Sequence, residues 1–187
     1  SEMCIRDRLV SPLLFGKLLE KLENLSQEPT ASEWVDHLSC LKLMYLLSYR
    51  TGLRLNEVRC LKIQDIICPE LLYKEKENTV FNNITLHIQD NSYRRLKTRS
   101  ANRQIPLKIA LSEHEFLVVQ RYIQHRYEQY LVNQQDDLLF SVNHRVLTDQ
   151  CISKITVDLF SQILGMHHGF SFHTLRHSAA TVSYTHL

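Results

Sequence analysis

Residues 51–57 (TGLRLNE) mark the point at which the most apolar helix of the sequence is expected to end. The residues leading up to Thr51 are almost wholly apolar, which predicts a helix buried at the centre of the fold. Gly52 is a natural stop for such a helix, because glycine adopts left-handed backbone angles without strain. Arg54 then follows at the mouth of a loop. It could form an ion pair with Glu57, three residues later, or it could face an anionic ligand.

The sequence around this stretch shows mainly helical periodicity. Helices are predicted for residues 12–26, for a segment capped by Thr30 and Glu33, for a segment capped by Ser112 and Glu115, for 148–164, and from Ser171 onward. Alternating apolar residues predict a strand within 79–89, and a second strand ends at 105–107 after a turn at 90–92. We therefore expect an α+β fold, mostly α-helical, in which a small antiparallel β-sheet carries a basic hairpin.

A strip of basic side chains occupies residues 91–112, which contain no acidic residue. Its members are Arg94, Arg95, Lys97, Arg99, Arg103 and Lys108. A local strip of this kind can bind phosphates even when the whole chain is nearly neutral. The alternative is a solvated hairpin tip, and charge alone does not decide between the two.

Residues 173–177 (HTLRH) place three polar side chains on one face of the last predicted helix. His173, Arg176 and His177 are three and four residues apart, which is the spacing of helical neighbours. A histidine can move a proton near neutral pH while the arginine beside it holds a phosphate. A zinc site is the alternative, but the glutamate of an H-E-x-x-H helix is absent. His167 and His168, just before this helix, are predicted to be surface residues.

Two arginines in separate motifs suit one kind of chemistry. Phosphodiester transfer without a metal must neutralise the charge that builds on the nonbridging oxygens, and the paired donors of a guanidinium group match those oxygens. Arg54 and Arg176 are therefore candidates to hold a phosphate. Lys97 is a candidate to donate a proton to a leaving oxygen.

The composition describes one domain of ordinary size and places few limits on function. The 187 residues are 44% hydrophobic and 22% charged, with a net charge of +2. The five cysteines are scattered without a C-x-x-C pair, which is typical of a reducing compartment, so we expect a cytoplasmic protein. No apolar run approaches the ~20 residues that would cross a bilayer, and the first residues lack the apolar segment of a signal peptide. No membrane association is expected.

Taken in order, residues 51–57, residues 97–107 (KTRSANRQIPL) and residues 173–177 resemble the catalytic domain of the tyrosine recombinases, or phage-type integrases. The resemblance implies a domain over residues 9–181 that acts on double-stranded DNA, as a homo-oligomer in the full-length parent. It implies DNA cleavage and rejoining through a 3′-phosphotyrosyl intermediate, for site-specific recombination or integration, without a metal or nucleotide cofactor.

The same resemblance implies a role for each candidate residue. Arg54 and Arg176 would hold the scissile phosphate, Lys97 and His173 would handle protons, and His177 would assist the phosphate pocket. Glu57 would be a supporting residue that orients its neighbours. The arginines of the basic strip would contact DNA, namely Arg94, Arg95, Arg99 and Arg103.

The nucleophile of that family is a tyrosine well beyond the second arginine. Tyr184 lies only eight residues after Arg176, which is about 12 Å along a continuing helix, so we expect that it is not the nucleophile and that this chain lacks one. Residues 1–8 and 182–187 resemble foreign tails. Two alternatives to a recombinase fragment are a DNA-binding module without catalysis, decayed or regulatory, and a type IB topoisomerase-like enzyme.

Overall fold

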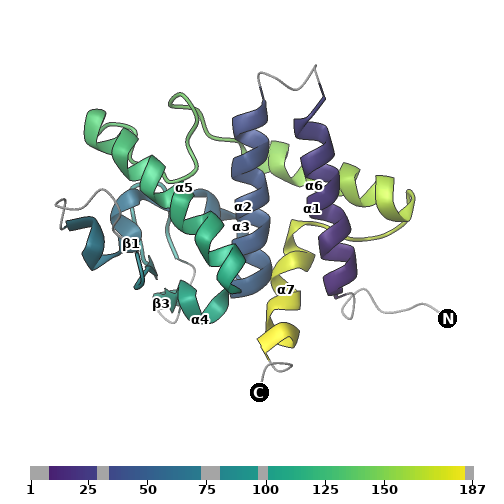
Figure 1. Ribbon diagram of the computed structural model, residues 1–187. Coiled ribbons are helices and arrows are strands. Elements are labelled where there is room, and N and C mark those ends of the chain that lie inside the picture. Colours follow the sequence, from purple (N-terminus) through teal and green to yellow (C-terminus); the bar gives the residue numbers. More distant parts are fainter. Residues whose placement is uncertain (1–8, 29–33, 73–80, 97–100, 184–187) are drawn as a thin grey trace. The chain divides into compact units, whose positions relative to one another are not determined.

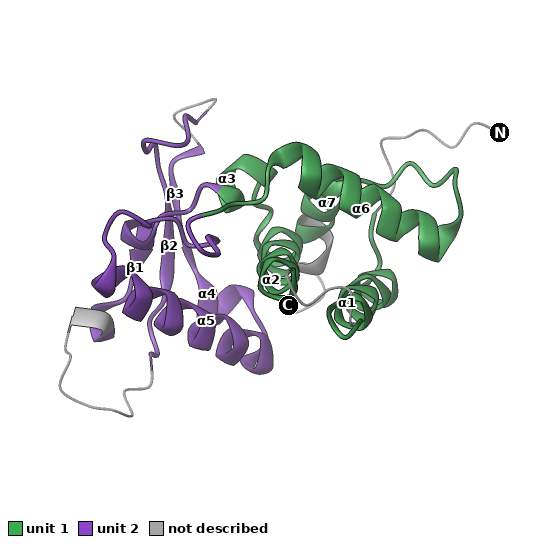
Figure 2. Ribbon diagram, turned by 90° about the horizontal axis from the view of Figure 1, so that it is seen from above, with its two compact units in different colours: residues 1–59, 145–187 green, residues 60–144 purple. Residues whose placement is uncertain are grey.

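The computed structural model of the protein describes residues 9–28, 34–72, 81–96 and 101–183 (Figure 1). The chain divides into two compact units (Figure 2): unit 1 comprises residues 1–59 and 145–187, and unit 2 comprises residues 60–144. Both ends of the sequence thus contribute to unit 1. The assignment of one catalytic domain to residues 9–181, with foreign tails on either side, stays a prediction.

Unit 1 is built from five helices within its described residues. They are α1 (Pro12–Ser26), α2 (Val35–Thr51), α3 (Leu55–Arg59), α6 (Asp149–Leu164) and α7 (Phe172–Ser183). The predicted bounds of α1 and the C-terminal ends of α2 and α6 are confirmed, because the caps are local: Ser11 accepts from the Leu14 amide, Gly52 ends α2 and Gly165 ends α6.

Helix α2 is the centre of unit 1, as its apolar sequence predicted. It packs against α1, α3 and α7, and α7 lies alongside it in Figure 1. Leu41, Met44 and Tyr45 are fully buried. The Tyr45 hydroxyl lies 2.7 Å from Thr156 Oγ1 on α6, and the Tyr45 ring packs against Phe172 at the start of α7. This core fixes the helix that carries the HTLRH motif.

Unit 2 contains a three-stranded antiparallel sheet in the order β1-β2-β3. Its elements are η3 (Ile63–Asp65), β1 (Ile66–Ile67), η4 (Pro69–Leu72), β2 (Thr85–Ile88), β3 (Arg103–Pro106), α4 (Leu107–Ala110) and α5 (Glu113–Val132). The register places Leu86 opposite Ile66 on one side and Ile105 on the other. The alternation predicted for β2 is confirmed, since Leu86 and Ile88 are fully buried.

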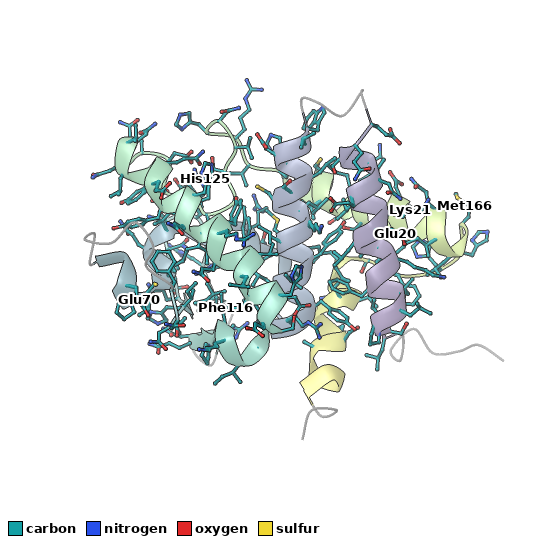
Figure 3. The ribbon with its side chains drawn as sticks, in the orientation of Figure 1. Glu20, Lys21, Glu70, Phe116, His125 and Met166 are labelled. Atoms are coloured by element: carbon teal, nitrogen blue, oxygen red, sulfur yellow. The ribbon has the colours of Figure 1, made fainter. Side chains whose placement is uncertain are left out.

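Helix α5 begins at the predicted capping box, in which Ser112 and Glu115 bond each other's backbone amides. Phe116, labelled in Figure 3, lies in the first turn of this helix and is buried. Figure 3 also labels Glu70 and His125 in this unit.

Several details of unit 2 and α2 differ from the prediction. Strand β1 and helix α4 were not predicted, because two and four residues are too short to show a period. The helical spacing after Ser112 predicts that Tyr127 and Tyr130 point inward, but both are half-buried. The buried residue there is Arg126, which donates to the Leu138 and Leu139 carbonyls. The capping box predicted at Thr30 and Glu33 lies outside the described residues.

Within the described segments, no helix combines the length and the apolar character needed to cross a membrane.

Candidate active site

The candidate site is formed in unit 1 by the turn after α2 and by the first half of α7. Gly52 ends α2 with φ 71° and ψ 21°, in the left-handed region, and its amide donates to the Ser48 carbonyl. A Cβ on Gly52 would lie 3.6 Å from Ala179 Cβ, so α7 passes close behind the turn. The next residue, Leu53, is fully buried, and the Arg54 side chain after it is partly exposed. Glycine is thus required here by the backbone angles and fits the close approach of α7.

Glu57 holds Arg54 through two bonds. The Arg54 backbone amide donates to Glu57 Oε2 at 2.9 Å, and Arg54 Nη1 donates to Glu57 Oε1 at 3.0 Å. The Glu57 side chain is 4% exposed, whereas the Arg54 side chain is 39% exposed. The ion pair that was the alternative interpretation of Arg54 is therefore present, and it agrees with the supporting role expected of Glu57. A buried carboxylate fixes one edge of a partly exposed guanidinium group.

Arg176 connects α7 to the same turn. Its Nε donates to the Gly52 carbonyl oxygen at 2.9 Å, although the two residues are 124 positions apart in the sequence. Because Gly52 lies two residues before Arg54, this bond places the second arginine at the turn that carries the first. The structure thus brings Arg176 to the turn that carries Arg54, although the two motifs are more than a hundred residues apart in the sequence.

His173 and His177 form a pair on the exposed side of α7. Their Nε2 atoms are 2.7 Å apart, and their rings meet edge to face. In a hydrogen bond between two imidazole nitrogens, one nitrogen donates and the other accepts, so at least one of the two rings is neutral.

The charges around His173 favour its neutral form. Partial burial lowers the pKa of His173 below its ordinary value of 6.5, and the neighbouring His177, Arg176 and Arg54 each lower it further. Both arginines therefore act electrostatically on one imidazole. A neutral imidazole near two guanidinium groups can accept a proton near neutral pH while the arginines hold an anion.

The arrangement is chemically suited to an anionic ligand with several oxygens. Arg54, Arg176 and the histidine pair supply positively charged and neutral donors around the Gly52 turn and α7, and Glu57 bonds Arg54. Two guanidinium groups at one turn can each offer paired N–H donors to a phosphate. Lys97 and Arg99, two of the three charged residues of the second motif, lie outside the described residues.

The basic strip is not uniformly exposed, and the expectation for Arg94 needs correction. Arg94 is 4% exposed, and its guanidinium donates to the Gln89 carbonyl at 2.6 Å and pairs with Asp65 at 3.3 Å. A buried arginine bonded to backbone and carboxylate has a structural role in the base of the hairpin. Arg95 is exposed, and Arg103 is half-buried with one bond to the Ala101 carbonyl. That these two arginines contact DNA stays a prediction.

The prediction for the two histidines before α7 is half wrong. His167 is exposed as expected, but His168 is only 8% exposed. It bonds Ser161 and the Phe170 amide and packs beside Phe160. Sequence reasoning missed it because a histidine next to a glycine gives no local sign of burial; the flanking aromatic residues were the available signal.

The two tyrosines of unit 1 that the structure describes are both buried. The Tyr45 hydroxyl bonds Thr156, and burial raises the pKa of this phenol. The Tyr49 hydroxyl donates to the Val10 carbonyl at 3.2 Å. Neither is presented for attack on a ligand at Arg54 and Arg176. Tyr184 lies outside the described residues.

Among the residues that the structure describes, no three histidine, cysteine, aspartate or glutamate side chains gather in a metal-binding arrangement. The histidine pair of α7 accordingly has no third ligand of these types within the described part of the chain.

Comparisons with known proteins agree with the fold. The chain is similar to two solved structures of the XerH site-specific recombinase, one bound to a palindromic difH substrate after cleavage and one bound to difH substrate before cleavage. Each is 20% identical with a TM-score of 0.56 and covers 95% of this chain, but the match spans only 42% and 43% of the recombinase chains. The chain therefore spans less than half the length of these structural relatives. A comparison with curated proteins found no match.

A comparison of the sequence with models of protein families identifies the family of this chain. The model of the phage integrase family matches residues 20–186, a range that contains all three motifs and the turn at Gly52. The chain belongs to the phage integrase family.

Proposed function

We propose that this chain is the catalytic part of a site-specific recombinase that binds double-stranded DNA and stabilises the transfer of a phosphodiester to a tyrosine. The single observation that carries the proposal is the bond from Arg176 Nε to the Gly52 carbonyl. It brings a second guanidinium group to the turn that carries Arg54, as a phosphate with developing negative charge would require. Membership in the phage integrase family supports the same conclusion.

The proposed roles follow from the contacts of each side chain. Arg54, held at one edge by Glu57, and Arg176, held through Nε, bind the nonbridging oxygens of the scissile phosphate. His173, with its lowered pKa, accepts the proton of the attacking hydroxyl, and His177 supports it through the bond between the rings. Lys97, on the basis of the second motif, donates a proton to the leaving oxygen.

The nucleophile is not assigned to Tyr45 or Tyr49, because both hydroxyls are buried in the core of unit 1. That this chain lacks the nucleophile, and that Tyr184 does not serve, stays a prediction from spacing. The related solved proteins are recombinases bound to their difH DNA, which favours DNA as the ligand here. Assembly into an oligomer on DNA is proposed for the full-length parent.

Binding to a fluorescent mixed-sequence duplex, followed by anisotropy, tests the arginine pair. Arg54→Ala and Arg176→Ala should each weaken binding by about tenfold, since each removes a charged hydrogen-bonding group worth about 1.4 kcal/mol or more. Arg176→Lys should recover only part of that loss, because lysine keeps the charge but lacks the paired donors. Arg145→Ala, an exposed arginine of unit 1, is the matched control for the loss of one charge.

Equal losses of DNA affinity in Arg145→Ala and Arg176→Ala would show that only total charge matters, and the proposed phosphate site would be wrong.

A nicked duplex and a denaturing gel test the nucleophile. The 187-residue chain should give no covalent DNA adduct. An adduct that disappears in Tyr184→Phe would assign the nucleophile to Tyr184 and contradict the prediction made from its spacing.

A further inference from the structure

His168 lies in the connection between α6 and α7 and is held from both sides of its ring. Its Nδ1 accepts from the Phe170 backbone amide at 2.8 Å, and its Nε2 lies 3.0 Å from Ser161 Oγ on α6. The ring also packs beside Phe160 and Phe170, with centroids 5.9 Å and 6.2 Å away. This buried histidine has no part in the roles proposed above. Its environment differs from that of Met166, labelled in Figure 3, which is 81% exposed in the same connection.

The two bonds determine which nitrogen of His168 carries the proton. Nδ1 accepts from an amide and must therefore be unprotonated. Ser161 donates its hydroxyl hydrogen to the Val157 carbonyl at 2.9 Å, so it can only accept from His168 Nε2. The two contacts thus place the ring hydrogen of His168 on Nε2. A protonated ring would leave the Phe170 amide facing another N–H group.

The Phe170 amide stands directly before the start of α7. Ser171 follows, and its amide donates to Thr174 Oγ1 at 3.0 Å while its carbonyl accepts from the Thr174 amide. Phe172 is then buried against Tyr45 of α2. The bond from Phe170 to His168 therefore fixes the chain against α6 two residues before α7 begins. His173, Arg176 and His177 all lie on that helix.

We propose that His168 is a positioning residue for the phosphate site: its Nδ1 fixes the start of α7 so that His173 and Arg176 lie beside Arg54 and the Gly52 turn. This inference rests on the proposed function for its consequence in DNA binding. Its structural content, that the His168–Phe170 bond holds His173 among the charges of the site, can be tested without DNA.

Three variants separate the bond from the bulk of the side chain. His168→Leu keeps much of the volume but offers no acceptor. His168→Asn offers a side-chain oxygen close to the position of Nδ1, so it can still accept from the Phe170 amide. His167→Leu changes the exposed neighbour and is the matched control. Circular dichroism establishes that each variant is folded.

The first measurement is the titration of His173 by NMR in the full chain without DNA. In the wild type its pKa lies below 6.5. His168→Leu should move it back toward that ordinary value, because α7 no longer holds His173 close to both arginines, whereas His168→Asn and His167→Leu should leave it lowered. A nitrogen-15 spectrum of the histidine rings should show His168 with hydrogen on Nε2 alone.

The second measurement is duplex DNA affinity. His168→Leu should bind about fivefold more weakly than the wild type, as expected for the loss of one hydrogen bond, and His168→Asn should restore most of the affinity. One outcome separates the inference from the proposed function. If Arg54→Ala and Arg176→Ala leave DNA affinity unchanged but His168→Leu still raises the pKa of His173, the proposed function fails and the inference stands. An unchanged His173 titration in a folded His168→Leu overturns the inference. If that variant does not fold, hydrogen on Nδ1 in the wild type, or a His168→Asn variant without the lowered pKa, overturns it.

Discussion

Arg54 makes a structural contact with Glu57, and the same side chain is proposed to contact a phosphate. The sequence offered an ion pair with Glu57 or a ligand contact as alternatives, and the structure shows the ion pair with 39% of the arginine side chain exposed. Glu57 uses one oxygen for the backbone of Arg54 and the other for its guanidinium. The pair therefore orients the arginine, and Glu57 occupies only one edge of the guanidinium group. The spacing of three residues made this contact predictable.

Replacing Glu57 by Gln tests this arrangement. The amide keeps the shape but loses the charge and one of two acceptors, so the free energy of unfolding should fall by about 1 kcal/mol, a value discounted for the exposure of Arg54. Urea unfolding measures the change. Glu23→Gln is the control, since the Glu23–Lys42 pair is exposed on both sides and should contribute about 0–0.5 kcal/mol. Equal losses in both variants would contradict an orienting role for Glu57.

At the scale of elements, what is local in the sequence was predictable and what depends on distant partners was not. The caps of α1, α5 and α6 lie within three residues of the helix that they begin. The bounds predicted for α1 and α6 and the start predicted for α5 are nearly correct. The burial of Arg94 depends on Asp65, 29 positions away. An isolated arginine is usually exposed, so its own surroundings in the sequence favoured the wrong environment.

The last turn of α2 gives a prediction that contrasts two glycines. Gly52→Ala should lower the free energy of unfolding by about 1 kcal/mol, because the left-handed angles at this position strain any residue with a Cβ, although the nearest atom is 3.6 Å away. Gly16 lies inside α1, and a methyl group added there would meet nothing within 4 Å, so Gly16→Ala should raise the free energy of unfolding by about 0.5–1 kcal/mol. Thermal or urea unfolding of both variants gives the comparison. A destabilised Gly16→Ala would mean that the packing of α1 is misjudged.

At the scale of the whole molecule, the three motifs fall into two units. The first and third motifs meet in unit 1, through the bond from Arg176 to Gly52, whereas the second belongs to unit 2. The order of the motifs in the sequence identified the family, and the apolar pattern of α2 predicted the core that supports the site. The meeting of Arg54 and Arg176 had to be inferred from the resemblance, since no local rule connects residues so far apart. Periodicity also gave no sign that the chain divides at Arg59.

The basic strip provides the last prediction, because the DNA contacts proposed for unit 2 would differ in their salt dependence from those of the proposed phosphate site. Arg95 is exposed and Arg103 is half-buried, and each is proposed to contact a backbone phosphate. Replacing either by Ala should weaken binding to all duplex sequences about equally and reduce the slope of log affinity against log salt by about 1, since one fewer counterion is released. Lys17→Ala on α1, also exposed, removes the same charge and should leave the slope unchanged. If Arg95→Ala and Arg103→Ala both keep the wild-type slope over a salt series, the strip is solvated surface, and contacts to DNA must come from other residues.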